Sequence, residues 1–168
     1  MTQPVIRHAE SSDYKNIIRV VNEWWGGRDM APMLPRLFLV HFRNTSFVAE
    51  HQGEIVGFVI GFVSQTFPAE AYIHFTGVHP AFRKTGLGRR LYERFFSAAE
   101  SLGCSKVRCV TSPVNKLSIA FHLGMGFTME DTGTFIDGIP FAKGYDGEGE
   151  DRVLFSRCFS RSEFEPIP

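Results

Sequence analysis

The sequence predicts a single α/β (α+β) domain whose central sheet is mixed, mostly antiparallel and flanked by helices, in the order βααβββαβαββ. Two observations lead to this prediction. Short apolar runs of strand length alternate with segments whose apolar residues recur at helical spacing. The 168 residues suit one folding unit, expected over residues 1–160 and followed by a loose tail at 161–168.

The N-terminal half begins with a strand and two helices and continues with two paired strands. The expected ranges are a strand at 4–8, helices at 13–25 and 34–42, and strands at 47–50 and 55–64. Ile17, Val21 and Trp24 lie at helical spacing, and Gly26 ends the first helix. A tight turn through Gly53 joins the two strands, and the second is apolar on both faces, which predicts a central place in the sheet.

The C-terminal half carries a crossover and a second short helix. The expected ranges are a strand at 72–78, a helix at 86–102, a strand at 106–111, a helix at 115–123, a strand from 127 and a last strand at 152–159. Leu87, Leu91 and Phe95 recur at helical spacing. Gly124 closes the short helix, and an irregular acidic stretch is expected from 136 to 151.

The turn from the strand at 72–78 into the following helix carries two cations and two glycines. Its residues are Arg83, Lys84, Thr85, Gly86, Leu87 and Gly88. The first N–H groups of a helix have no helical partner, and glycines let a ligand approach them, so such a turn attracts a pyrophosphate. A P-loop would need Lys-Ser or Lys-Thr after its final glycine, and none follows Gly88; the third glycine and ribose-binding acid of a dinucleotide fold are also missing.

The spacing R-x-x-G-x-G after V-x-P, at the opening of a helix, resembles the acetyl-CoA loop of the GNAT N-acetyltransferase superfamily. Asn115, followed by the segment AFHLGMGF at 120–127, resembles the second signature of that family, and the order of elements agrees along the chain. The resemblance implies an N-acetyltransferase with acetyl-CoA as co-substrate. It would transfer the acetyl group directly from the thioester to the primary amine of a small or amino-acid-like acceptor.

The resemblance also implies which residues hold coenzyme A. The turn residues would bind the diphosphate, and Thr76, Gly77 and Val78 at the strand end would pair with the pantetheine arm and polarise the thioester carbonyl. A glycine inside a strand marks a bulge or a close approach, which suits Gly77. Asn115 either caps the short helix or contacts the cofactor, and the two roles can coexist.

Three residues are candidates for proton transfer. The family commonly places a Tyr four residues before the closing glycine as the acid that protonates the CoA thiolate, and here that position is His122. His122 either transfers protons as an imidazole or simply packs. Some relatives carry a Glu where this chain has Tyr72. His74 is expected on the same strand face as Tyr72 and Thr76, where it either relays a proton or is a core histidine.

The family fold implies that the acceptor enters between the first two helices and the late strands. Trp25, Arg28 and Asp146 are the residues expected to line this entrance, with Trp24 in the core. Residues 130–151 hold seven acids and one Lys, a net charge of −6, which would concentrate a cationic amine.

Composition sets limits on partners and location. The chain has 18 basic and 18 acidic residues, so no overall field favours nucleic acid or an anionic membrane. The longest apolar run, at 55–63, is too short to span a bilayer, and the N-terminus lacks the layout of a signal peptide. A cytoplasmic protein is therefore expected, and the family analogy allows a homodimer.

The three cysteines and six histidines show no paired-ligand spacing, so no metal is expected. Two other functions remain open beside acetylation of a small-molecule amine. One is acetylation of a protein N-terminus or lysine. The other is a non-catalytic CoA-binding sensor module, which the absence of the family's Tyr and of its strand Glu would allow.

Overall fold

The computed structural model describes residues 2–159, and the expected tail at 161–168 lies outside these residues. The strands are β1 Val5–His8, β2 Phe47–His51, β3 Glu54–Val63, β4 Glu70–Val78, β5 Lys106–Thr111, β6 Thr128–Met129, β7 Phe135–Ile136, β8 Ile139–Pro140 and β9 Val153–Cys158. The α-helices are α1 Asp13–Trp24, α2 Leu37–His41, α3 Leu87–Ser101 and α4 Lys116–Gly124. Short 3-10 helices occupy Ala31–Met33, Arg43–Thr45 and Pro80–Phe82.

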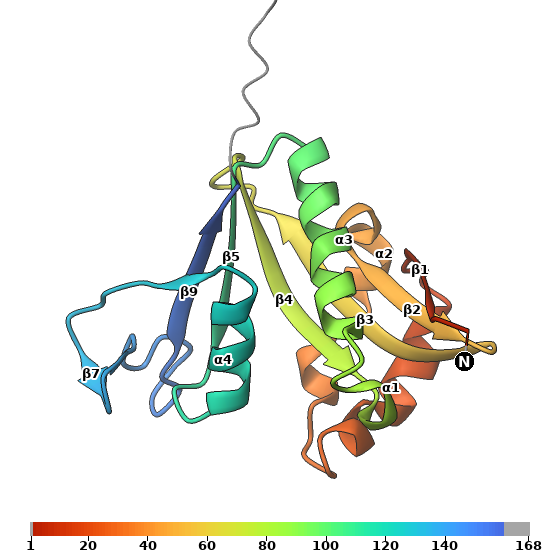
Figure 1. Cartoon of the computed structure of the whole chain (residues 1–168), viewed down its shortest axis with the longest axis horizontal. Helices are drawn as coiled ribbons and strands as arrows, with labels where there is room; N and C mark the ends of the chain where they lie inside the picture. The colour runs from red at the N-terminus through yellow and green to blue at the C-terminus, as the bar shows by residue number, and fades with distance from the viewer. Residues whose placement is uncertain (1, 160–168) are drawn as a thin grey trace, which may run out of the picture.

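Seven strands form one sheet in the order β1-β2-β3-β4-β5-β9-β6, with helices on both faces (Figure 1). Every neighbouring pair is antiparallel except β4 and β5, which are parallel. This architecture and the order of its main elements confirm the predicted fold class. The small β7–β8 ribbon lies within the stretch expected to be irregular.

The second helix is shorter than predicted. It was expected over 34–42, but α2 covers only Leu37–His41. Leu34 has φ −123° and ψ 73°, outside the helical region, because the residue before a proline is disfavoured there and Pro35 follows it. The expected helix is thus reduced to the α-helical segment Leu37–His41, preceded by a buried Leu34.

Each face of the sheet has its own core. Helix α3 covers one face, where Leu91 and Phe95 are fully buried against strand residues such as Val59. Helices α1 and α2 cover the other face, where Ile17 and Trp24 pack with Phe58. Strand β3 contributes to both cores, which confirms its predicted central place.

Strands β4 and β5 touch at one end only. They pair at three positions, from Glu70 opposite Lys106 to Tyr72 opposite Arg108, and then separate, as Figure 1 shows. At the point of contact, Arg108 forms ion pairs with Glu70 and Glu130. We call the diverging part of the sheet, between residues 73–78 of β4 and β5, the wedge. It interrupts the sheet at its centre.

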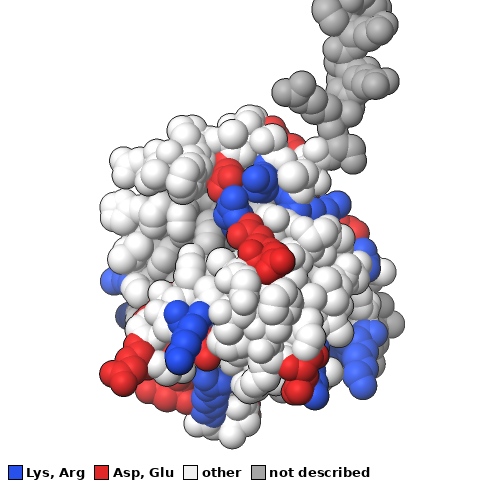
Figure 2. Space-filling model, turned by 90° about the vertical axis from the view of Figure 1, so that its left-hand side faces the viewer, with Lys and Arg blue, Asp and Glu red and all other residues white. Residues whose placement is uncertain are grey.

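Charges on the side of the molecule that carries β7 and β9 are mixed in sign. Figure 2 shows Lys and Arg side chains lying beside Asp and Glu side chains on this face. Two ion-pair groups account for part of this pattern: Arg108 with its two glutamates, and Arg152 with Asp146 and Glu150. The acidic stretch is therefore partly neutralised by arginines from neighbouring strands.

Candidate active site

The end of β4 has backbone groups that β3 does not use. The N–H of His79 donates to the carbonyl oxygen of Val56 at 2.9 Å, which fixes the alternation of the β3–β4 ladder. In that register the N–H and C=O groups of Thr76 and Val78 point away from β3. Since β5 has already diverged, these groups face the wedge, where an extended molecule bearing amides can pair with them as a strand would.

Gly77 makes room for two aromatic rings. A Cβ at this position would lie 2.6 Å from the ring of Phe58 and 2.9 Å from that of Trp25. Its own polar groups belong to the ladder with β3, so the free backbone groups here are the N–H and C=O of Thr76 and the N–H of Val78. The close approach that was expected at Gly77 is therefore made by the protein's own rings, those of Phe58 and Trp25.

Strand β4 has its bulge at His74, three residues before Gly77. The register with β3 shifts between Ile60 and Gly61, which pair with Phe75 and Ile73, so His74 is the extra residue. The shift reverses the alternation of side chains, and the expectation that Tyr72, His74 and Thr76 share one face is wrong. His74 stays with Tyr72 on the α2 face, while Thr76 points toward α3.

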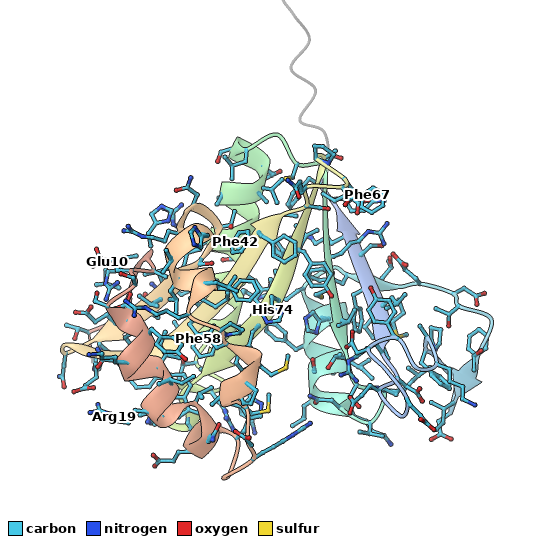
Figure 3. The ribbon with its side chains drawn as sticks, turned by 180° about the vertical axis from the view of Figure 1, so that it is seen from behind. Glu10, Arg19, Phe42, Phe58, Phe67 and His74 are labelled. Carbon is cyan, nitrogen blue, oxygen red and sulfur yellow. The ribbon has the colours of Figure 1, made fainter. Side chains whose placement is uncertain are left out.

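His74 is held in one orientation. Its ring stacks on Phe38 with centroids 4.4 Å apart, and its Nε2 lies 2.7 Å from the carbonyl oxygen of Met33. A carbonyl only accepts hydrogen bonds, so Nε2 carries the proton in the neutral ring and Nδ1 is the basic atom. Figure 3 shows His74 on β4 on the same side as Phe42 and Phe58, toward α1 and α2.

The glycine-rich turn has the open backbone that anion binding requires. Gly86 is the N-cap of α3 with φ +87°, in the left-handed region, and no side chain caps this helix end. Within residues 2–159, none of the backbone N–H groups of 84–89 donates a hydrogen bond to a protein acceptor. These unsatisfied donors, at the positive end of the fifteen-residue helix α3, suit a diphosphate.

The first three side chains of the turn differ in their contacts and exposure. Arg83 donates through Nε to the carbonyl oxygen of Val78 at 3.2 Å and through Nη2 to that of Trp24. Its guanidinium thus joins the end of β4 to the end of α1, and its contact with a diphosphate stays a prediction. Lys84 and Thr85 are exposed, and Thr85 donates to the Phe82 carbonyl oxygen.

The last two residues of the turn face the protein. Leu87 is 2% exposed in the α3 core. A Cβ at Gly88 would lie 3.5 Å from the Phe121 ring of α4, so Gly88 brings the turn close to that helix. Asn115 caps α4, since its side-chain oxygen accepts from the N–H of Ser118 at 3.1 Å. This confirms the capping role, and its contact with a cofactor stays a prediction.

His122 is buried rather than open to the wedge. It is 6% exposed, its Nδ1 lies 2.7 Å from the Ser118 carbonyl oxygen, and its Nε2 lies 2.9 Å from the Tyr92 hydroxyl. The ring also stacks on Phe155. Burial lowers the pKa of His122, partly opposed by the hydrogen bond to Ser118. No local pattern pointed to the partner Tyr92, which lies 30 residues away on α3.

The depressed pKa of His122 predicts a pH-dependent stability. The unfolded chain takes up a proton near pH 6.5 whereas the folded chain resists it, so stability falls as pH drops below about 6.5, by at most about 1.4 kcal/mol per pH unit. His122→Gln should flatten this dependence between about pH 5 and 7. Urea unfolding at several pH values measures it, with exposed His41→Gln as the matched control. An unchanged slope in His122→Gln would contradict the assignment.

Tyr72 marks the acceptor side of the wedge. Its ring stacks on Phe62, and burial raises its pKa, so it is a neutral hydroxyl near pH 7. Nearby groups that act on the same pKa include Tyr145, Asp146 and Arg152 of the late loop and strand. That the late acidic loop lines the entrance for the acceptor stays a prediction.

The residues expected to line the acceptor entrance differ in their surroundings. Trp25 packs on Phe75 at 5.2 Å and over Gly77, beside the wedge, while Trp24 is buried as predicted. Arg28 is exposed just beyond α1. Asp146 forms an ion pair with Arg152 at 2.6 Å, which reduces the charge it offers to an amine.

Glu70 is the first residue of β4, and its carboxylate forms ion pairs with Arg108 and Lys106. Its hydrogen bonds with Arg108 lower its pKa, with Lys106 adding to the effect. Glu70 is therefore an ionised ion-pair partner at the contact between β4 and β5 and a poor proton acceptor.

Within residues 2–159, no group of three or more His, Cys, Asp or Glu side chains is arranged to hold a metal, and no helix is both long and apolar enough to cross a membrane.

Known proteins share this fold and parts of this sequence. An L-2,4-diaminobutyric acid acetyltransferase of Nocardia farcinica is 33% identical over 79 residues, 47% of this chain and 41% of the relative. A second, from Virgibacillus pantothenticus, is 30% identical over 84 residues, 50% of this chain and 53% of the relative. The chain thus spans about half of the length of these curated relatives.

A diaminobutyrate acetyltransferase of Paenibacillus lautus, solved with its substrate and coenzyme A, matches along 100% of both chains with TM-score 0.69 and 23% identity. The similarity of this structure supports the fold alone. The sequence model of the acetyltransferase (GNAT) family matches residues 8–127, which is most of the chain and includes the turn, β4 and α4. With the turn at the mouth of α3 and the wedge beside it, these matches show that the chain belongs to the GNAT acetyltransferase family.

Proposed function

We propose that this chain is an N-acetyltransferase that takes its acetyl group from acetyl-CoA and transfers it to the primary amine of a small, amino-acid-like molecule. One observation carries the proposal. The open N–H groups of residues 84–89 lie just after the free backbone edge of β4, so a diphosphate and an amide-bearing arm can be held by adjacent segments.

The chain's residues divide the binding of coenzyme A among them. The N–H groups of residues 84–89 offer backbone donors to the diphosphate, with the exposed Lys84 supplying a positive charge. Thr76 offers its N–H and C=O to the pantetheine amides, and the N–H of Val78 offers a donor to the thioester carbonyl. Coenzyme A supplies an acetyl thioester, whose carbonyl carbon accepts an amine nucleophile.

The acceptor class follows from the relatives and from the walls of the wedge. The curated relatives are named for L-2,4-diaminobutyric acid, a small amino acid with two amines. In this proposal Tyr72, Trp25 and the Arg152–Asp146 pair line the acceptor side, which is supported by the effect of Asp146 and Arg152 on the Tyr72 pKa and by the packing of Trp25 on Phe75 of β4. Arg152 suits a carboxylate and Asp146 suits an ammonium group, which is the pairing that an amino-acid-like acceptor needs.

The acceptor amine must lose a proton when it attacks. Tyr72 is neutral and cannot take the proton, and Glu70 is held by Arg108. Of the residues predicted for catalysis on this face, His74 is the one whose unprotonated nitrogen, Nδ1, is left free by its hydrogen bond. His74 is our candidate for accepting that proton.

Release of coenzyme A thiol tests the function. Purified protein with acetyl-CoA and a panel of amines, including L-2,4-diaminobutyrate, other diamino acids, polyamines and a peptide with a free N-terminus, should release thiol steadily with the small amino-acid-like amines. Mass spectrometry of the products identifies the acetylated nitrogen. Binding of acetyl-CoA without turnover on the whole panel would favour a sensor module, and turnover on the peptide alone would favour a protein acetyltransferase.

A further inference from the structure

Asn22, in the last turn of α1, is the centre of a hydrogen-bond network in the loop that follows this helix. Its backbone carbonyl oxygen accepts from the N–H groups of Trp25 at 3.1 Å and Gly27 at 2.9 Å. Its side-chain oxygen accepts from the N–H groups of Met30 and Ala31, both at 2.8 Å. One residue therefore holds the loop at four backbone positions.

The side chain of Asn22 takes the place of a local cap for the short 3-10 helix that begins at Ala31. Met30, at the N-cap of this helix, makes no capping hydrogen bond with its own side chain. Pro32 has no N–H group, and the N–H of Met33 donates to the Met30 carbonyl oxygen at 3.0 Å. The N–H groups of Met30 and Ala31 are therefore the donors that need a partner at this end, and Asn22 accepts from both.

Asp29 fixes the direction in which the amide of Asn22 points. The Nδ2 of Asn22 donates to a carboxylate oxygen of Asp29 at 3.2 Å, and an ionised carboxylate only accepts hydrogen bonds. The reversed amide would place its own N–H groups against those of Met30 and Ala31. The side-chain oxygen of Asn22 is thus directed at the 3-10 helix from both sides of the amide.

The other end of the 3-10 helix holds His74. The carbonyl oxygen of Met33 lies 2.7 Å from His74 Nε2, and the ring of His74 stacks on Phe38 of α2. Pro32 alone separates Ala31 from Met33, and its ring fixes its own φ. The group that fixes Ala31 therefore also fixes the direction of the Met33 carbonyl.

We propose that Asn22 is a positioning residue for the acetyl transfer, because it fixes the 3-10 helix whose last carbonyl holds His74 with Nδ1 free. The inference rests on the proposed function, since His74 is the residue proposed to accept the proton of the amine. Asn22 acts through the Met33 carbonyl rather than by contact with a substrate. An imidazole released from Met33 is free to rotate and to exchange its proton between the two nitrogens, so Nδ1 would face the amine as a base for only part of the time.

The two oxygens of Asn22 have separate tasks. The backbone carbonyl holds Trp25 and Gly27, whereas the side-chain oxygen holds the 3-10 helix. A side-chain substitution leaves the backbone carbonyl in place. Variants at Asn22 therefore change the orientation of His74 while Trp25, which is expected to line the acceptor entrance, keeps its hydrogen bond.

Asn22→Ala should lower kcat about 10-fold with the amine of highest turnover, because it disturbs a general base worth about 100-fold or more without removing it. The KM for the amine should change less than about threefold, and the Kd of acetyl-CoA by isothermal titration should stay within about twofold, since neither binding surface is altered. Asn16→Ala, exposed on the same helix, is the matched control and should keep the wild-type kcat.

Further variants separate position from chemistry. Asn22→Gln keeps the amide but lengthens the side chain, so it should lower kcat as Asn22→Ala does. Asn22→Asp combined with Asp29→Asn keeps an acceptor for both N–H groups and a donor between the two side chains, so it should restore most of the wild-type kcat. Asn22→Ala combined with His74→Gln should cost no more than His74→Gln alone, because Asn22 acts through that ring.

Nitrogen-15 NMR of the free protein gives a readout that needs no substrate. At a pH where the ring is neutral, His74 of the wild type should show two widely separated nitrogen shifts, because the Met33 carbonyl holds one tautomer. In Asn22→Ala this separation should narrow, since the released ring exchanges between tautomers. The signals of His74 are assigned by their loss in His74→Gln.

Three results would overturn the proposal. These are a wild-type kcat in folded Asn22→Ala or Asn22→Gln, losses that add to that of His74→Gln, and nitrogen shifts of His74 that Asn22→Ala leaves unchanged. A loss of kcat that the exchanged Asn22–Asp29 pair does not restore would assign Asn22 to loop packing alone. Failure of the proposed function would look different, because the wild-type protein would show no turnover with any amine while the His74 shifts still depended on Asn22.

Discussion

Gly86→Glu is expected to weaken acetyl-CoA binding at least about 100-fold, a loss of about 2.7 kcal/mol. Gly86 has φ +87° at the mouth of α3, and a side chain in this region adds strain of about 1–2 kcal/mol. A carboxylate there would also repel the diphosphate and neutralise the positive end of the helix dipole. Isothermal titration of acetyl-CoA into the purified variant measures the effect.

Gly53→Glu is the matched control for this substitution. Gly53 has φ +82°, also has open space around its position, and lies in the turn between β2 and β3. It should show similar strain and the same added charge with unchanged acetyl-CoA affinity. Gly86→Ala separates strain from charge and should lose less affinity than Gly86→Glu. Equal affinities of Gly86→Glu and wild type would show that the diphosphate binds elsewhere.

The second large effect is expected on stability. Gly61→Ala should lower the free energy of unfolding by about 3 kcal/mol. A Cβ at Gly61 would overlap the ring of Phe95 and the carbonyl oxygen of Tyr72, and a backbone atom cannot move aside as the end of a side chain can. Because Gly61 pairs with Ile73 beside the bulge, the variant should also displace His74. Urea unfolding and thermal melts measure the loss.

Gly57→Ala, on the same strand, serves as the comparison. A Cβ at Gly57 would lie 3.1 Å from a methyl group of Leu91 and 3.3 Å from one of Leu87, both of which can shift by small side-chain rotations, although the Gly77 carbonyl oxygen is also 3.3 Å away. Its cost should be about 1 kcal/mol. Similar free energies of unfolding for the two variants would mean that the backbone of β4 can shift at the bulge with little loss of stability.

The end of β4, the glycine-rich turn and helix α3 were predictable because each leaves a local mark in the sequence. Glycines, cations and helical periodicity follow one another within 20 residues of the chain, from the end of β4 into α3. The capping of α4 by Asn115 was likewise visible, since a cap acts on the backbone three residues away. Local signals of this kind can be recognised in the sequence without knowledge of tertiary contacts.

Features that depend on an extra residue or on distant contacts were not predictable. Tyr72, His74 and Thr76 alternate in sequence as if on one face, and nothing local reveals the bulge that moves Thr76 to the other side. The partner of His122 comes from a different helix. Arg83 looked like a phosphate ligand, yet its guanidinium is shared by two carbonyl groups that only the folded chain brings together.

The separation of β4 from β5 has a consequence for what the protein can recognise. Most sheets expose unused hydrogen-bonding groups only along their outermost strands, where other chains can attach and aggregate. Here such groups occur in the middle of the sheet, between two of its own strands. A slender guest with regularly placed amides can complete the interrupted hydrogen-bonding pattern from within, so main-chain geometry, rather than a set of side chains, selects the shape of the guest.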